Sequence, residues 1–366
     1  MGRFRVHRSF TALLLLFAFT LRPAHADRDD SEEFDEFLPT SNVIPWDGIP
    51  WQVATVPERI VVIGDIHGDL NNLIRLLRET ELVTGKRAEW VGGKAHLVLL
   101  GDLIDRGVDS KAVMLYVKEL IQQAQFSGGD VHVLLGNHEA LAAEGDFRAT
   151  KHEIESLRKG TKMGKAEALH WAYRDINGPF ANWIASRNSI VQLGSYVFVH
   201  AGLGAWAVEN DPGEVNSTVR AWIRYLQGNG AKPRSETSWV VDDDFRSPLW
   251  IRAMSSSSSL SRILYPGNLL QRILDKLSAT HIFIGHSVTD HKDYRIVRKH
   301  PDFGESVIEM DTGNSYAVGG RPSVLVIEGD SMTEVYPSRK RNTYWITKKL
   351  RSVCIDDIRG ISRIKK

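Results

Sequence analysis

The feature of this sequence that most constrains its fold is a pattern that occurs five times: a short apolar run followed directly by glycine and polar residues. The runs lie at residues 60–63, 97–100, 131–135, 196–199 and 282–284. Short runs rich in β-branched and aromatic residues and bounded by glycine predict buried β-strands. Because ligands of layered α/β proteins bind where strands end, we expect the polar segments to converge on one site.

Six polar segments carry the side chains expected at that site. In chain order they are Gly64-Asp65-Ile66-His67-Gly68, Gly101-Asp102-Leu103-Ile104-Asp105-Arg106-Gly107, Gly136-Asn137-His138-Glu139, His200-Ala201-Gly202, Trp250-Ile251-Arg252 and Gly285-His286. Carboxylate, imidazole and amide groups without thiolates are suited to hard or borderline divalent cations. Guanidinium groups bind phosphate through two parallel donors. The segments together therefore predict a metal-dependent site that acts on phosphate esters.

The bulk composition is that of a soluble globular protein. The 366 residues are 42% apolar and 25% charged, and the formal net charge is +1. A near-neutral chain gives no electrostatic indication of a nucleic-acid partner, so we predict none. The single cysteine, Cys354, excludes an internal disulfide framework. The oligomeric state stays open.

The N-terminus has the layout of a secretory signal peptide. Arg3, Arg5 and Arg8 precede an apolar stretch over residues 10–21, which Ala24-His25-Ala26 follows. A basic region, an apolar region and a small-residue cleavage site predict cleavage after residue 26. The stretch is shorter than the ~20 residues that cross a bilayer. We therefore expect no stable membrane span in the mature chain and a secretory, secreted or periplasmic location; an uncleaved anchor is the alternative.

The rest of the chain divides by composition. Residues 27–56 begin with a strongly acidic run and predict a linker. The motifs predict one catalytic domain over residues 57–336, and residues 337–366 form a basic tail. Within the domain, apolar residues of 149–187 recur at near-helical spacing and predict a helical insertion, which would either cap the site or pack on the sheet edge. Asn216-Ser217-Thr218 matches a glycosylation sequon.

In content and order, the motifs of residues 57–330 resemble the phosphoprotein phosphatases of the metallophosphoesterase superfamily. Three further segments resemble the bacterial-like Shewanella-like phosphatase subgroup: Gly145-Asp146-Phe147-Arg148, Ser247-Pro248-Leu249-Trp250-Ile251-Arg252 and Met310-Asp311-Thr312-Gly313-Asn314-Ser315. The Ser-Ala-Pro-Asn-Tyr-Cys stretch of the common eukaryotic Ser/Thr phosphatases is absent. The resemblance implies a calcineurin-like α/β fold with a central β-sandwich flanked by helices, and it leaves phosphoserine/threonine against phosphotyrosine preference open.

The resemblance also implies a set of metal ligands for two divalent cations, which would be Mn, Fe or Zn. Asp65 and His67 would hold the first cation, and Asp102 would bridge both. Asn137, His200 and His286 would complete the second site. His200 and His286 each follow a predicted strand and lie beside a glycine or a small residue, which favours the ligand role over a packing role.

Four further residues take catalytic roles by the same resemblance. Arg106 and Arg252 would bind the non-bridging phosphate oxygens. His138 would be the general acid that protonates the leaving oxygen, and Asp105 would hold its imidazole. A metal-bound hydroxide would attack phosphorus in line, without a phosphoenzyme. The predicted activity is hydrolysis of phosphomonoesters on phosphorylated protein substrates.

Two alternative functions remain at this point. Dinucleoside polyphosphate hydrolases of the same superfamily share an Asp-Thr-Gly like that of residues 311–313 but usually lack the acidic residue that corresponds to Asp105. Its presence favours protein phosphomonoesters. The other alternative is a catalytically inactive binding scaffold in the secretory pathway, which would normally have lost a ligand, whereas all six are present here.

Overall fold

The computed structural model describes residues 49–289, 294–337 and 342–345. The predicted signal peptide, residues 27–48 of the predicted linker, and Cys354 with most of the basic tail lie outside these described residues. Among the described residues, the helices are all too short or too polar to span a bilayer.

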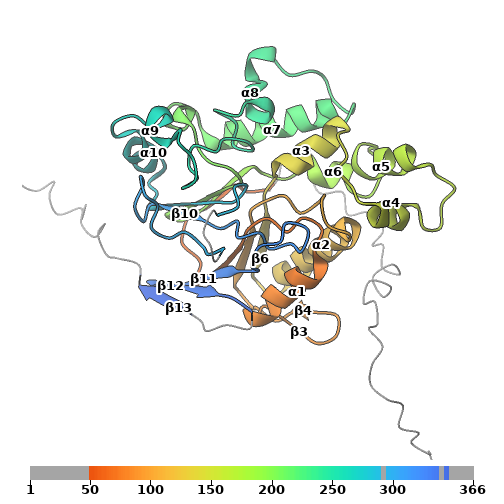
Figure 1. Ribbon diagram of the computed structural model, residues 1–366, viewed down its shortest axis with the longest axis horizontal. Coiled ribbons are helices and arrows are strands. Elements are labelled where there is room, and N and C mark those ends of the chain that lie inside the picture. The colour runs from red at the N-terminus through yellow and green to blue at the C-terminus, as the bar shows by residue number, and fades with distance from the viewer. Residues whose placement is uncertain (1–48, 290–293, 338–341, 346–366) are drawn as a thin grey trace, which may run out of the picture.

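Two β-sheets packed face to face form the centre of the molecule (Figure 1). The first has the order β13-β12-β11-β2-β5-β6, and the second has the order β1-β7-β8-β9-β10. The strands of the first sheet are β2 (Arg59–Ile63), β5 (His96–Leu99), β6 (Asp130–Val133), β11 (Val324–Glu328), β12 (Ser331–Val335) and β13 (Asn342–Trp345). Those of the second are β1 (Gln52–Val53), β7 (Ile190–Leu193), β8 (Tyr196–Val199), β9 (His281–Ile284) and β10 (Val307–Glu309). A small hairpin pairs β3 (Val83–Thr84) with β4 (Glu89–Trp90).

The parallel strands of the two sheets explain why the polar motifs meet. In the first sheet β2, β5 and β6 run parallel, and in the second β8, β9 and β10 run parallel. Parallel neighbours end on the same side of a sheet, so the motif that follows each strand emerges at a shared edge. The predicted α/β fold, a β-sandwich flanked by helices, is confirmed.

Alternation along the strands builds two cores. Ile60 and Val62 of β2 belong to the buried layer between the sheets, together with Phe198 and Phe283 from the second sheet. The intervening Val61 and Ile63 belong to the larger core beneath the helices. Side chains of a strand point alternately to its two faces, and here both faces are covered. This is why the sequence shows continuous apolar runs rather than an apolar–polar alternation.

Helices cover the outer faces of the sandwich (Figure 1). They are α1 (Leu70–Glu79), α2 (Ser110–Phe126), α3 (Asn137–Glu144), α7 (Pro212–Leu226), α8 (Trp239–Asp242), α9 (Ser261–Leu264) and α10 (Leu269–Leu277). Several begin at side-chain caps: Asp69 accepts a hydrogen bond from the backbone N–H of Asn72, and Asp211 caps α7, whose first residue is Pro212. These caps satisfy backbone donors that a helix leaves unpaired at its N-terminus.

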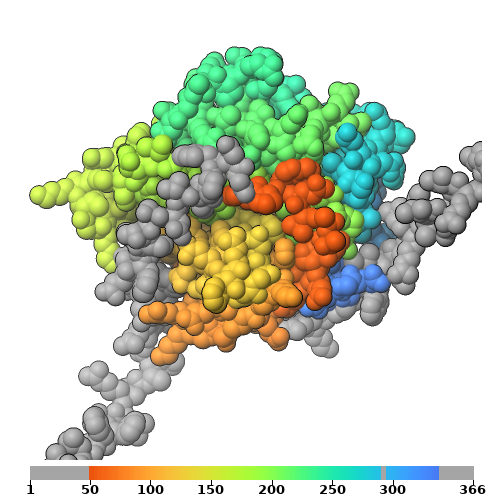
Figure 2. Space-filling model, turned by 180° about the vertical axis from the view of Figure 1, so that it is seen from behind, coloured from red at the N-terminus to blue at the C-terminus, as the bar shows by residue number. Residues whose placement is uncertain are grey.

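The segment of residues 149–187 contains three helices, α4 (Lys151–Arg158), α5 (Lys165–Tyr173) and α6 (Ala181–Ile184). This segment forms a projecting edge of the molecule, yellow-green at the left of Figure 2. Its first helix contacts α2, which directly follows the motif that contains Asp105 and Arg106.

The sequon asparagine is a structural residue. Asn216 lies on α7, and its side chain is 1% exposed. Its Oδ1 accepts hydrogen bonds from the backbone of Ser189 and Ile190 and from the Ser189 hydroxyl, while its Nδ2 donates to the Ile190 carbonyl. The amide therefore ties α7 to the start of β7, and in the folded protein it is not available to carry a glycan.

Candidate metal centre

The turns that follow the strands hold several motif residues in the left-handed region of backbone conformation. The φ angles of His67, Asp102 and His286 are 46°, 49° and 64°, and those of Asp105 and Arg106 are 66° and 65°. A left-handed backbone costs an L-residue about 1–2 kcal/mol, and such residues concentrate at functional sites. The tight turns bring these side chains back over the strand ends.

Two motif glycines are needed because the turns lie against acidic side chains. A Cβ at Gly136 would lie 2.1 Å from Oδ1 of Asp102, and one at Gly285 would lie 2.4 Å from Oδ1 of Asp65. Real side chains do not tolerate such contacts, so a larger residue at either position would displace a carboxylate.

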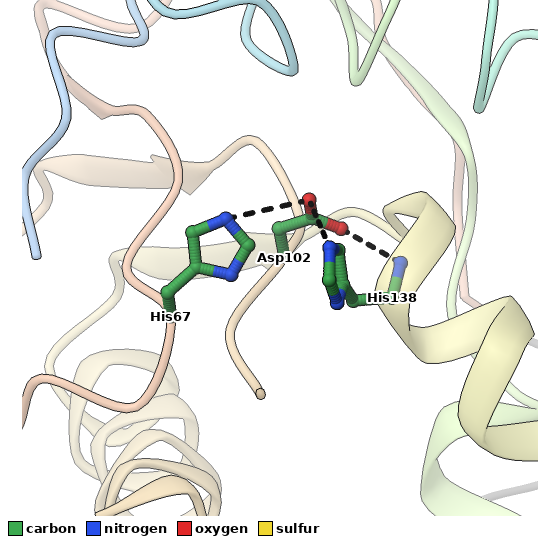
Figure 3. A group of neighbouring side chains, drawn as sticks. All are labelled: His67, Asp102 and His138. Atoms are coloured by element: carbon green, nitrogen blue, oxygen red, sulfur yellow. Dashed lines mark hydrogen bonds and ion pairs between the residues drawn. The ribbon is translucent and has the colours of Figure 1, made fainter. Parts of the chain in front are cut away.

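Asp102 lies at the middle of the converging side chains. Its carboxylate is 3.7 Å from Nε2 of His67, 3.5 Å from Nε2 of His200 and 4.0 Å from Nε2 of His138. It also accepts a hydrogen bond of 2.9 Å from the backbone N–H of His138. Figure 3 shows His67 and His138 on either side of this carboxylate. All four side chains are buried.

The hydrogen bonds of two histidines leave their other ring nitrogens aimed at Asp102. Nδ1 of His67 donates to the carbonyl of Ile104 (3.1 Å), and Nδ1 of His200 donates to the carbonyl of Leu100 (2.8 Å). Each Nε2 then carries a lone pair that faces a carboxylate. Two electron-rich groups facing each other in a buried site are stabilised by a cation between them, and an outer hydrogen bond of this kind is typical of metal-binding histidine.

Asn137 and His286 lie on the other side of Asp102. Oδ1 of Asn137 is 3.1 Å from Nε2 of His200 and 3.0 Å from Nδ1 of His286. The buried Nε2 of His286 has no hydrogen-bond partner among the described residues. The backbone N–H of His286 in turn donates to the carboxylate of Asp65, at 3.1 and 3.2 Å from its two oxygens.

The electrostatics of the site also favour cation binding. Burial, with the neighbouring carboxylates Asp311 and Asp102, raises the pKa of Asp65 well above its usual range. Burial and the Glu139 carboxylate do the same to Asp102. Burial lowers the pKa of both His67 and His200 to about 3, so these imidazoles are neutral. Several buried carboxylates beside neutral imidazoles favour the binding of positive charge, and the donor set fits divalent cations.

Two overlapping sets of donor atoms lie close enough to hold a metal ion. His67, Asp102 and His138 form one, and Asp102, His200 and His286 form the other; within each set the atoms lie within 4.8 Å of one another. Asp102 belongs to both. The first set contains His138, whereas the predicted ligand Asp65 lies beside it, next to Asp102 and Asp311. The structure thus brings all six predicted ligands to one edge of the sandwich.

His138, Asp105 and Arg106 form a chain beside this centre. Nδ1 of His138 lies 2.9 Å from Oδ2 of Asp105, and Nε and Nη2 of Arg106 lie 3.4 and 3.3 Å from Nε2 of His138. Burial, followed by the Arg106 charge, lowers the pKa of His138 to about 3. Burial raises the pKa of Asp105 to about 7.

Arg252 lies next to His286. Its Nη1 donates to the hydroxyl of Ser287 (3.0 Å) and to the carbonyl of His286 (3.3 Å), and the residue is solvent-exposed. The ring of Trp250 contacts that of His286 edge to face, with centroids 6.0 Å apart. The two arginines of the motifs are therefore exposed cations, one in contact with His138 and the other with His286.

Two acidic residues at the site had no predicted role. Glu139 accepts hydrogen bonds from the backbone N–H groups of Asp102, Leu103 and Gly136, at 2.8–3.0 Å, and so holds two motif turns together. Asp311, which follows β10, is hydrogen-bonded to Asp65, and burial raises its pKa to about 6. The sequence signal for Glu139 was available because it is part of a polar motif, whereas the segment before Asp311 is interrupted by Glu309 and gives no clear apolar run.

Comparison with known proteins agrees with this geometry. Residues 58–290 match the calcineurin-like phosphoesterase family. The chain is 26% identical over 330 residues to Shewanella-like protein phosphatase 2 of Arabidopsis thaliana, which covers 79% of this chain and 80% of the relative. It is 27% identical over 254 residues to Shewanella-like protein phosphatase 1 of Plasmodium berghei, covering 68% of this chain and 65% of the relative. A crystal structure of a cold-active protein-tyrosine phosphatase from a psychrophilic Shewanella species superposes with a TM-score of 0.66 at 22% identity, covering 84% of this chain and 87% of that chain.

Proposed function

The chain belongs to the calcineurin-like phosphoesterase family, and we propose that it uses two divalent cations to hydrolyse phosphomonoesters on phosphorylated protein substrates. It is a hydrolase that acts on phosphate esters; the number of cations and the substrate are the proposal. The observation that carries it is the position of Asp102, which belongs to both donor sets while the His138–Asp105 pair lies directly beside it.

The cations would be held by residues whose geometry suits them. Asp65 and His67 would bind one, Asn137, His200 and His286 would bind the other, and Asp102 would contact both. Bound divalent cations, which would be Mn, Fe or Zn, supply charge neutralisation for a phosphate group and lower the pKa of water. Glu139 would contribute by fixing the turn that carries Asp102.

Protonation of the leaving oxygen would fall to His138. Asp105 accepts from Nδ1, so Nε2 is the atom available for proton transfer. Arg106 contacts that atom in this structure. A phosphate dianion is a stronger partner for a guanidinium than an imidazole nitrogen is. Substrate binding would therefore draw Arg106 onto the phosphate oxygens and release Nε2 of His138 to carry a proton.

Arg252 would bind the same phosphate from the other side. Its guanidinium is exposed, and one of its nitrogens is anchored by Ser287. Two guanidinium groups that approach a phosphate from opposite sides fix its orientation, and phosphoryl transfer depends mainly on such positioning and on charge stabilisation.

A protein substrate is favoured over a dinucleotide by two observations. Two curated relatives that align with most of the chain are named protein phosphatases. The Asp105 carboxylate is also positioned on His138, which a strongly basic leaving group such as a serine alkoxide requires. Serine, threonine and tyrosine phosphoesters all remain within the proposal.

The test compares four substrates on one preparation. Three peptides that differ only in phosphoserine, phosphothreonine or phosphotyrosine are assayed beside diadenosine tetraphosphate, in excess Mn²⁺ and after chelation. We expect metal-dependent phosphate release from at least one peptide, with higher kcat/KM than for the dinucleotide. Preferential cleavage of the dinucleotide would overturn the protein-phosphatase proposal. No turnover of any substrate by metal-loaded protein would favour the inactive scaffold.

A further inference from the structure

A buried chain of hydrogen bonds connects the helical insertion to the residue that holds His138. The hydroxyl of Tyr173 donates to Oε1 of Glu153 (2.6 Å), and the hydroxyl of Ser110 donates to Oε2 of the same carboxylate (2.9 Å). The backbone N–H of Asp105 then donates to Oγ of Ser110 (3.1 Å). Tyr173, Glu153 and Ser110 are 2%, 1% and 0% exposed.

Each member of this chain has a defined direction of hydrogen bonding. The Ser110 hydroxyl has one proton, which it gives to Glu153, so its oxygen is left to accept from Asp105. The Glu153 carboxylate accepts from two hydroxyl groups. Buried polar groups are costly unless they are hydrogen-bonded. The arrangement gives these buried groups hydrogen-bond partners, and through Ser110 it holds the backbone at Asp105.

The backbone conformation of Asp105 depends on contacts with neighbouring segments. Its backbone is left-handed, with φ of 66°, and so is that of Arg106, with φ of 65°. A turn of two such residues would relax if nothing held it. Two more contacts hold this loop against α4: Nδ1 of His152 lies 3.0 Å from the carbonyl of Val108, and Nζ of Lys111 donates to the carbonyl of Ser156 (3.3 Å).

We propose that Glu153 is a positioning residue for the reaction, and that the insertion holds the general acid in place through Glu153, Ser110 and Asp105. The insertion thus influences proton transfer through α4, which positions Asp105, rather than only by covering the site or by packing on the sheet. This inference rests on the proposed role of His138 as the general acid.

The proposal predicts a loss that depends on the leaving group. A misplaced Asp105 weakens proton donation by His138, which matters for a basic serine alkoxide and scarcely for nitrophenolate. The variants are Ser110→Ala, Tyr173→Phe and Glu153→Gln; the last keeps the size of the side chain but accepts at only one atom. Glu155→Gln, on the exposed side of the same helix and paired with Lys151 at 3.7 Å, is the matched control.

We expect Ser110→Ala to lower kcat/KM for a phosphoserine peptide about tenfold, a part of the usual ~10²–10⁴-fold contribution of general acid catalysis, with much less effect on nitrophenyl phosphate. Tyr173→Phe and Glu153→Gln should show the same pattern more weakly, and Glu155→Gln should match wild type on both substrates. The downfield imidazole proton of the His138–Asp105 hydrogen bond should shift in Ser110→Ala by proton NMR and stay in place in Glu155→Gln.

A double-mutant cycle separates this inference from the proposed function. If Glu153 and Ser110 act only through Asp105, Ser110→Ala should cost little more in an Asp105→Asn background. Additive losses, or equal losses on both substrates with normal metal content and melting temperature, would overturn the inference. If Asp105→Asn itself shows no dependence on the leaving group, the proposed role of His138 fails instead. Should Ser110→Ala not fold, Tyr173→Phe, which removes a single hydroxyl, answers the same question.

Discussion

Nδ1 of His138 lies 2.9 Å from Oδ2 of Asp105, and both side chains are buried beside Asp102. This contact holds Nδ1 of the ring toward Asp105. Nε2 therefore faces the centre, 4.0 Å from the Asp102 carboxylate. The relationship assigns proton transfer to one atom of one residue, and this makes the mechanism testable.

Loss of His138 should affect substrates according to their leaving groups. General acid catalysis contributes about 10²–10⁴-fold, or roughly 3–5 kcal/mol of barrier. His138→Ala should therefore lose most of its rate on a phosphoserine peptide and much less on nitrophenyl phosphate. The measurement is kcat/KM for both substrates, with metal content determined on the same samples. Asp105→Asn should show the same pattern more weakly. Equal losses on both substrates would mean that His138 supports a metal or binds phosphate instead.

Replacement of Asp102 should disturb both cation sites together. Its carboxylate belongs to both donor sets, so Asp102→Asn should lower the bound metal from about two per chain to well below one. His286→Ala, which removes a ligand from one set, is the matched control and should lose about one. Metal content by elemental analysis is the readout, and the rise in melting temperature on adding Mn²⁺ should shrink in parallel. Two metals retained in Asp102→Asn would show that this residue is not the bridge.

Glu153 should make the metal-free protein less stable as the pH rises. Burial raises the pKa of Glu153 from 4.5 to about 7. A raised carboxyl pKa means that the folded state binds more protons, so the stability from this group is lost as the pH rises from about 4.5 through about 7. Glu153→Gln lacks this ionisation. Its free energy of unfolding relative to that of wild type should therefore increase by up to about 3 kcal/mol as the pH rises from about 4 to about 8. Urea unfolding of both proteins in chelator measures the difference; a difference that did not change with pH would contradict the shifted pKa. Glu155→Gln should show no such trend.

The N-terminal segment carries a prediction that the described residues do not address. We propose that the mature protein begins near Asp27 and lies in a secretory or periplasmic lumen, because a basic and an apolar region precede Ala24-His25-Ala26. N-terminal sequencing of protein from its native host is the measurement. An intact Met1 would favour an anchor or a cytosolic protein.

The sequence predicted the fold because both faces of its central strands are covered. Runs such as residues 60–63 are then continuously apolar, which identifies the strand. The glycine and the ligand-type residue that follow such a run indicate where the strand ends. Strand β10 was not predicted because it is three residues long and ends in Glu309, a charged residue that is buried in the fold. Asp311 was therefore not recognised as part of the cluster around Asp65.

Residues that act through hydrogen bonds could not be read from sequence. Glu153 lies on a short helix with polar neighbours, where a glutamate is normally solvated, and only the fold shows that it is 1% exposed and accepts from Ser110 and Tyr173. Asn216 is the converse: it matches a glycosylation sequon, whereas in the folded chain its side chain is buried and hydrogen-bonded to Ser189 and Ile190. In both cases the role of the residue depends on hydrogen-bond partners that lie far away in the sequence.

The left-handed backbone at His67, Asp102, Asp105, Arg106 and His286 has a consequence for how such a chain evolves. Glycine would occupy these turns at lower conformational cost, so the five residues keep their chemistry at some expense of folding stability. A descendant released from selection for catalysis would be expected to drift toward glycine at these positions and to become more stable as it lost activity.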